Sequence, residues 1–227
     1  MGEHRMNLVK RKVSSSRDEK ERENKMAIKI ETVEVPGLDV RFGKYPVTQA
    51  QWKAVMKTNP SKFKGADCPV DSVTWYDAWR FINALSQVTG KKYRLPRSEE
   101  WVQACLGDPD EEGYGPVEGN NDPDLDEIAW HKGNAGGKTH PVGQKKPNIH
   151  GLYDMHGNVN EWCWDAYDDD GEVGVGGPQE PAFAAGGLGY AYMGGSWNDA
   201  NCWCSRGGTM NPDAKSPEFG LRIVEEI

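Results

Sequence analysis

Six short segments in a fixed order constrain the fold of this chain more than any other feature of its sequence. Each combines large aromatic or aliphatic residues with a glycine, a proline or a helix-capping residue, and is therefore suited to anchor irregular backbone on a core. The segments are Pro46–Trp52, Pro69–Ala78, Tyr93–Trp101, Gly151–Trp162, Gly194–Trp197 and Phe219–Arg222. Turn-forming residues are abundant, with Gly 27 and Pro 14 among 227 residues. We find no internal repeat and expect one domain of short elements joined by ordered coil.

Three helices are expected, each beginning at a capping residue. Thr48 begins the first, with Gln51 at the reciprocal position of a capping box. Thr74 begins the second, which ends at Gly90, and Ser98 begins the third. The residues expected on the buried faces are Trp52, Val55 and Met56 in the first, Ala78, Phe81, Ile82, Leu85 and Val88 in the second, and Trp101, Ala104 and Cys105 in the third.

Strands are expected to be short and concentrated towards the C-terminus. Residues 28–35 alternate apolar and charged side chains, which predicts a half-buried strand. Further short strands are expected around 159–164, 190–195 and 219–224. Residues 107–149 show no period, and a loop of that length is usually functional or held by other means. The prediction is an α+β fold with short strands and helices and extensive ordered coil.

The six segments resemble the formylglycine-generating-enzyme (sulfatase-modifying factor) family, a variant of the C-type lectin fold. The resemblance covers residues 30–224. It implies a C-type-lectin-like fold of the formylglycine-generating-enzyme subtype across a domain at 27–227, preceded by a charged tail at 1–26 that is flexible or depends on a partner. The fold does not by itself imply a function, because it hosts enzymes, accessory domains and ligand receptors.

Catalysis in this family uses copper held by two cysteines to oxidise a peptide cysteine with molecular oxygen. Cys204 stands at the position of the second cysteine, but Asp199, a hard oxygen ligand, stands at the position of the first. Cys202 is near, yet a Cys-x-Cys pair on a strand places its thiols about 7 Å apart, too far for two-coordinate copper without rearrangement. We therefore expect no copper and no catalytic residues, with a copper- and oxygen-dependent peptide-cysteine oxidase as the alternative.

The family also often holds calcium in the turn that matches Gly151–Trp162. By position, Asp154 and Glu161 would supply carboxylates, and Gly157 and Val159 would supply backbone oxygens. Such a set suits a hard cation. The resemblance therefore implies one structural calcium, and the alternative is that backbone N–H groups satisfy the two carboxylates.

The segment between Trp197 and Phe219 has the composition of a recognition surface, since it mixes small polar residues with large anchors and shows no period. Its position resembles the diversified region of the variable proteins of diversity-generating retroelements, the treponemal ones above all. That resemblance implies a scaffold of Trp197, Arg206, Pro212 and Arg222. It implies that the residues that vary and bind ligand are Asn198, Asp199, Asn201, Trp203, Ser205, Gly207, Thr209, Met210, Asp213, Lys215, Ser216 and Glu218. The alternative is an irregular loop whose tryptophans belong to the core.

Charge and cysteine content limit which partners the protein can bind and which cellular compartment it can occupy. The formal net charge is -8, and no Lys or Arg occurs between Lys146 and Arg206, which excludes nucleic acid as an expected partner. We expect a protein or other macromolecular ligand. The five cysteines form no Cys-x-x-Cys pair, and no apolar run is long enough for a leader or a membrane span. The protein is expected at the cell surface if a leader or anchor is missing from this chain. The alternatives are a cytoplasmic location and an accessory module that uses the charged tail.

Overall fold

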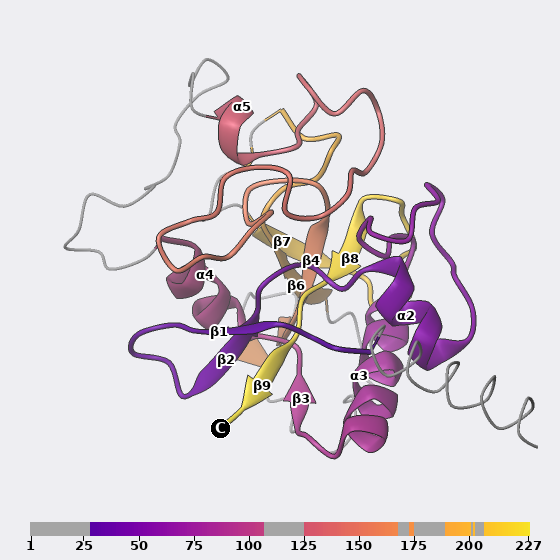
Figure 1. Cartoon of the computed structure of the whole chain (residues 1–227), viewed down its shortest axis with the longest axis vertical. Coiled ribbons are helices and arrows are strands. Elements are labelled where there is room, and N and C mark those ends of the chain that lie inside the picture. Colours follow the sequence, from indigo (N-terminus) through magenta and orange to yellow (C-terminus); the bar gives the residue numbers. More distant parts are fainter. Residues whose placement is uncertain (1–27, 107–124, 168–172, 175–188, 201, 203–206) are drawn as a thin grey trace, which may run out of the picture.

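The computed structural model describes residues 28–106, 125–167, 173–174, 189–200, 202 and 207–227 (Figure 1). The predicted tail at 1–26 lies outside the described residues. Within the described residues, no helix is long and apolar enough to cross a membrane. The fold combines two small sheets with helices and extensive coil, which confirms the predicted α+β class.

The two sheets are joined at the C-terminal end of the chain. The first contains, in spatial order, β1 (Thr32–Glu34), β2 (Val40–Gly43), β9 (Val224–Glu226) and β3 (Tyr93–Arg94), all antiparallel. The second has the order β5 (Val173–Gly174), β4 (Asn160–Tyr167), β6 (Gly189–Met193) and β7 (Gly207–Met210), and β8 (Phe219–Leu221) pairs parallel to β4. The chain therefore passes from one sheet to the other within Arg222 and Ile223, between β8 and β9.

Four helices are described: α2 (Gln49–Met56), α3 (Trp75–Thr89), α4 (Ser98–Leu106) and the single turn α5 (Leu125–Ile128). The predicted caps are confirmed, since Thr48 and Thr74 each form a complete capping box and Gly90 ends α3 in the left-handed conformation. One predicted core position is wrong. Val88 is 61% exposed, because the last turn of α3 extends beyond the core.

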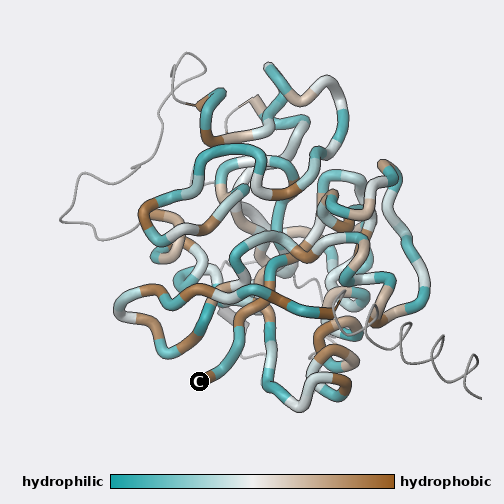
Figure 2. Tube along the Cα trace, in the orientation of Figure 1, coloured by the Kyte–Doolittle hydropathy of each residue, from teal (hydrophilic) through white to brown (hydrophobic). Residues whose placement is uncertain are grey.

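Two buried clusters fill the space between the helices and the sheets. Trp52 of α2 stacks on Phe81 of α3 with ring centroids 4.9 Å apart, and both belong to the larger cluster. Trp101 of α4 lies in the second cluster, beside strands of both sheets. Figure 2 shows short apolar stretches alternating with polar ones along the trace, as a fold of short elements requires.

The strand predictions were right in kind and inexact in extent. The stretch 28–35 forms a strand only at Thr32–Glu34, and 219–224 forms two strands that belong to different sheets. Five elements were not predicted, namely the short strands β2, β3, β5 and β7 and the helical turn α5. The strand β7 lies inside the C-terminal segment that shows no period, and α5 lies inside the predicted long loop. A strand of four residues that includes two glycines carries too weak a pattern to be detected.

Candidate recognition surface

The two ends of the C-terminal segment are fastened to each other. Ser196 Oγ lies 2.8 Å from Asp199 Oδ2 and 3.1 Å from Glu218 Oε2. Asn198 Nδ2 donates to Glu218 Oε1 at 3.2 Å, and Trp197 Nε1 donates to the carbonyl of Pro217 at 3.0 Å. The segment therefore starts and finishes at one point of the scaffold. We call this set of contacts among residues 196–199 and 217–218 the latch.

The latch is attached to the first residues of β4 and the turn before them. The backbone N–H of Trp197 donates to Asn158 at 3.0 Å, and that of Asn160 donates to Glu218 at 2.7 Å. Trp197 packs edge-on against Phe63, with centroids 5.3 Å apart. The scaffold role predicted for Trp197 agrees with these contacts, as does that of Pro212, whose carbonyl accepts from the N–H of Trp75 at 3.0 Å.

Three residues expected to vary and bind, Asn198, Asp199 and Glu218, are used by the latch. The carboxylate of Asp199 accepts from Ser196 N at 2.9 Å and from Ser196 Oγ, and its carbonyl accepts from the N–H of Lys132. Glu218 joins the far end of the segment to Ser196 and Asn198. In this arrangement both carboxylates stabilise the loop ends. Ser196, which the sequence analysis did not single out, is the centre of the latch, and its place in Gly194–Trp197 was the available signal.

The strand β7 decides which side chains in the middle of the segment face outward. It pairs antiparallel with β6, so its side chains alternate between the sheet's two faces. Thr209 is exposed, whereas Met210 is half-buried and packs against the larger core cluster. Gly207 is exposed, but a Cβ there would lie 2.7 Å from the carbonyl oxygen of Tyr192. Gly207 was predicted to vary, but this close contact allows only glycine there unless the backbone shifts.

The turn after β7 presents further exposed side chains on an anchored backbone. Ser72 N donates to the carbonyl of Ser216 at 3.2 Å, and Ala214 N donates to that of Asn211 at 2.8 Å. The side chains of Asp213 and Lys215 are exposed, as is that of Asn198 in the latch. Of the remaining predicted positions, Asn201, Trp203, Ser205 and the scaffold residue Arg206 lie outside the described residues.

A cavity of about 760 Å³ lies between α4 and the β6–β7 edge of the second sheet. Val102 and Leu106 of α4 form one wall, and Met193 of β6 and Thr209 of β7 form another. The lining is largely apolar. Among the residues predicted to vary and bind ligand, Thr209 contributes its side chain to this lining. Val102, Leu106 and Met193 could not be predicted as site residues, because nothing in the sequence places α4 beside β6.

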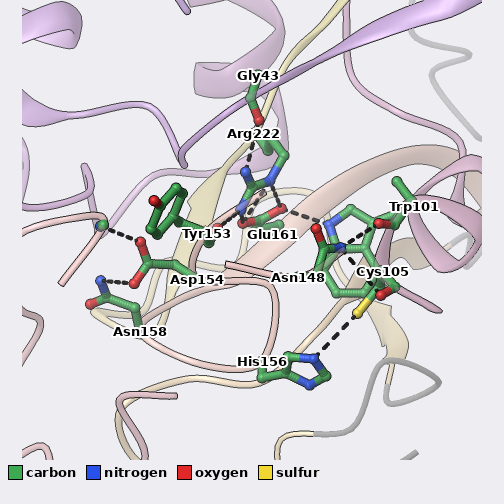
Figure 3. A network of polar contacts seen from close by, with 12 residues as sticks. Gly43, Trp101, Cys105, Asn148, Tyr153, Asp154, His156, Asn158, Glu161 and Arg222 are labelled. Atoms are coloured by element: carbon green, nitrogen blue, oxygen red, sulfur yellow. Dashed lines mark hydrogen bonds and ion pairs between the residues drawn. The ribbon is translucent and has the colours of Figure 1, made fainter. Parts of the chain in front are cut away.

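The turn predicted to hold calcium has a different arrangement (Figure 3). Glu161 is 1% exposed, and its carboxylate accepts from Arg222 at 2.8 to 3.2 Å and from Trp101 Nε1 at 2.6 Å. Asp154 accepts from Gly143 N at 2.8 Å and from Asn158 Nδ2 at 3.3 Å, and burial raises the pKa of its carboxyl to about 6. Arg222 already neutralises Glu161, so the two carboxylates do not fit a calcium site. Within the described part of the chain, no three metal-ligating side chains form a cluster.

Gly157 is required in this turn for a reason that lies outside its local sequence. The residues with positive φ are Asp154 and Asn158, at 58° and 70°, and Gly157 is not among them. A Cβ on Gly157 would lie 2.4 Å from the carbonyl oxygen of Trp130. The carbonyl of Gly157 accepts from the N–H of Val159 at 2.9 Å. Close approach of two backbone segments, not a left-handed turn, therefore requires this glycine.

None of the four cysteines that the structure describes carries an exposed free thiol. Cys105, at the end of α4, is disulfide-bonded. Cys68, Cys163 and Cys202 carry buried thiols, and burial raises the pKa of Cys163 well above that of an ordinary thiol. Cys202 Sγ lies 3.8 Å from the carbonyl oxygen of Ser196 and 3.9 Å from that of Asp199. Cys204 lies outside the described residues.

Comparisons with known proteins agree with this fold. Residues 10–227 match the family model described as sulfatase-modifying factor enzyme 1-like domain. A chaperone protein LppX from Paenibacillus barcinonensis is 33% identical over 82% of this chain and 80% of that protein. A formylglycine-generating enzyme from Thermomonospora curvata is 31% identical over 55% of this chain and 42% of its own length. The solved structure of Treponema denticola variable protein 1 superposes with a TM-score of 0.69 at 27% identity, covering 88% of this chain and 92% of that one. The C-type-lectin-like subtype is thereby confirmed.

Proposed function

The chain belongs to the sulfatase-modifying factor enzyme 1-like family, and from this premise we propose that it is a ligand-binding protein that displays a diversified recognition surface on its C-terminal segment. The observation that carries the proposal is the latch. It holds residues 197–218 at both ends, through Ser196 and Glu218. Several side chains between these ends are exposed and do not pack against the core. A loop whose ends are fixed independently of its middle tolerates changes in the middle.

The described part of the surface suits a macromolecular ligand. Asn198, Thr209, Asp213 and Lys215 offer exposed polar side chains, and the apolar cavity beside Thr209 offers a place for a hydrophobic side chain of the partner. An apolar pocket within a polar rim is the usual composition of a protein interface. The ligand is therefore a protein or another macromolecule that inserts an apolar group next to β7.

A location outside the cytoplasm follows from the same proposal. A surface that binds foreign partners has to be displayed, and the disulfide of Cys105 is stable in an oxidising compartment. The similarity to a treponemal variable protein supports display at a cell surface.

Sequencing the gene and its flanks in many clones of the source cells tests this function. The resemblance to the variable proteins of diversity-generating retroelements implies that an adenine-directed reverse transcriptase rewrites codons of this region. We expect differences confined to codons 198–218, with an adenine-rich near-copy of the segment close by. Codons for Asp199, Gly207 and Glu218 should vary least, because these residues are used by the latch or by close backbone contact. An invariant segment with no such copy would exclude the diversified surface.

A copper-dependent oxidase is the second candidate, because one relative is a formylglycine-generating enzyme. Its test is titration with Cu(I) under reducing conditions, comparing the wild type with Cys204→Ser. The carboxylate of Asp199 already accepts two hydrogen bonds from Ser196, which opposes its use as a ligand. Stoichiometric copper that is lost in Cys204→Ser would support the oxidase and overturn the binding function.

A further inference from the structure

A second pocket lies away from the recognition surface, between α3, β3 and the C-terminal strand. Its volume is about 380 Å³, within the range of roughly 300–1,000 Å³ that small-molecule sites occupy. In Figure 1, β3 and the end of α3 lie at the lower edge of the molecule, whereas α5 lies at the upper edge. None of the residues expected to vary lines this pocket.

The walls of the pocket are aromatic and firmly held. Trp79 of α3, Tyr93 of β3 and Trp164 of β4 line it, and all three are half-buried. The N–H of Trp164 donates to the carbonyl of Pro96 at 2.9 Å, and its ring lies 5.8 Å from that of Trp75. Tyr93 N donates to Ser86 Oγ at 3.1 Å. The two hydrogen bonds fix the backbone of Trp164 and Tyr93, and Trp75 packs against the Trp164 ring, so the faces of these rings suit a flat apolar body.

The charges around the pocket are unequal. Arg94 is neutralised, because it forms a bidentate pair with Glu100 at 2.7 Å and lies 3.5 Å from Glu226. Lys92 and Arg97 also line the pocket, and both are exposed. Within the described part of the chain, neither side chain forms a hydrogen bond or an ion pair. The backbone N–H of Arg97 donates to Glu100 Oε2 at 2.8 Å, and this bond and the charge of the Arg97 side chain both help to lower the pKa of that carboxyl against the raising effect of burial. Glu226 also lines the pocket and shares Arg94 with Glu100, so Lys92 and Arg97 leave an excess of positive charge at the rim in a chain whose net charge is -8.

From this juxtaposition we propose that the pocket is a binding site for a small planar aromatic anion, a ring that carries a carboxylate, sulfonate or phosphate. The ring lies against Trp79, Tyr93 and Trp164, and the anionic group meets Lys92 and Arg97 at the rim. Asn83 offers a neutral amide at the same rim. Two cationic side chains that form no ion pair within the described residues, placed beside aromatic faces, select for both parts of such a ligand.

Two fluorescent probes with similar ring systems test the proposal. The first is 8-anilinonaphthalene-1-sulfonate, which is anionic, and the second is N-phenyl-1-naphthylamine, which lacks the sulfonate. Each is titrated into the full-length wild type and into Lys92→Glu/Arg97→Glu. The control variant, Lys53→Glu/Lys132→Glu, makes the same change in net charge at exposed residues that do not line the pocket.

We expect the charge reversal at the rim to weaken binding of the sulfonate probe by about ten-fold or more, because attraction becomes repulsion. Binding of the uncharged probe should change by less than about two-fold, and the control variant should bind both probes as the wild type does. Equal effects of the rim and control variants on the sulfonate probe would overturn the proposal, since only the net charge would then matter.

A pocket-filling variant assigns the bound probe to this site. Asn83→Trp places a large ring at the mouth from an exposed position of α3 and removes no described hydrogen bond. It should abolish the component of probe binding that depends on Lys92 and Arg97. If that component persists in Asn83→Trp, the probe binds elsewhere, for example in the cavity beside β7, and the proposal is wrong. The recognition surface is untouched by these variants, so failure here leaves the proposed function standing.

Discussion

Arg222 and Glu161 form an ion pair that is sealed from solvent, with Arg222 Nη2 2.8 Å from Glu161 Oε1 and side-chain exposures of 0% and 1%. The guanidinium also donates to the carbonyls of Gly43 at 2.8 Å and Tyr153 at 2.7 Å, and Trp101 Nε1 donates to the carboxylate (Figure 3). The pair therefore connects β4, the end of β2, α4 and the crossing between the two sheets. Glu161, which the family resemblance implied as a calcium ligand, is a member of this ion pair instead.

Removing one charge of this pair should be far more damaging than removing a surface charge. We expect Glu161→Gln to lower the free energy of unfolding by about 3–5 kcal/mol, because it leaves the guanidinium buried without compensation. The matched control is Glu34→Gln, whose ion pair with Arg41 is solvent-exposed and should contribute less than about 1 kcal/mol. Urea unfolding of both variants measures the difference, and similar losses would contradict the proposed role of the pair.

The latch separates two classes of residue within the predicted recognition set. Asp199→Ala should cost about 1–2 kcal/mol, because the Ser196 N–H loses its acceptor. Asp213→Ala and Lys215→Ala should each change stability by less than about 0.5 kcal/mol, since both side chains are exposed. Thermal and urea unfolding check these values. A large loss at Asp213 or Lys215 would place the turn after β7 in the folding core and remove it from the binding surface.

Asp71 should make stability depend on pH in the direction opposite to an ordinary salt-bridged acid. Its carboxylate is fully buried, and burial raises its pKa in spite of hydrogen bonds from Lys62 N, Phe63 N and Ser72 Oγ. In the window between the unfolded and folded pKa values the folded state binds more protons, so stability falls as the pH rises. The free energy of unfolding of the wild type relative to Asp71→Asn should therefore decrease from about pH 4 upward and level off above the folded pKa. A constant difference across this range would contradict the raised pKa.

Calcium should have little effect on stability if Glu161 stays paired with Arg222. We expect the melting temperature in excess calcium to differ from that in EDTA by less than about 1 °C, with magnesium as the control for ionic strength. A rise of several degrees specific to calcium would mean that Asp154 and Glu161 act as ligands as the family resemblance implied, and that Arg222 releases the carboxylate.

The cysteine assignment gives a count that is simple to measure. With five cysteines in the chain, one disulfide at Cys105 and thiols at Cys68, Cys163 and Cys202, the unfolded protein should react with three equivalents of Ellman's reagent without reduction. Five equivalents should react after reduction. Five without reduction, from protein purified under non-reducing conditions, would remove the argument for an oxidising compartment.

The sequence by itself determined the local structure, because the signals for it lie within a few residues of each other. The capping box at Thr48 defines the start of α2, and the capping box at Thr74 with the Gly90 stop defines both ends of α3. The six framework segments were enough to predict the family and the α+β lectin-like class, since their aromatic residues, such as Trp75, Trp101 and Trp162, are the largest buried side chains. The capping of a helix and the burial of a tryptophan depend little on distant partners.

Only the tertiary structure decided what the charged and polar residues of the candidate site do. Asp199 and Glu218 look equally suited to bind a ligand in the sequence, but both carboxylates are committed to Ser196, that of Asp199 from three residues away and that of Glu218 from 22. Glu161 looks like a cation ligand until Arg222, 61 residues away, supplies the charge that neutralises it. Gly157 is required by the carbonyl of Trp130, which no local pattern reveals. Electrostatic pairing and close packing act through space, so the chain order that predicted the elements could not predict these partners.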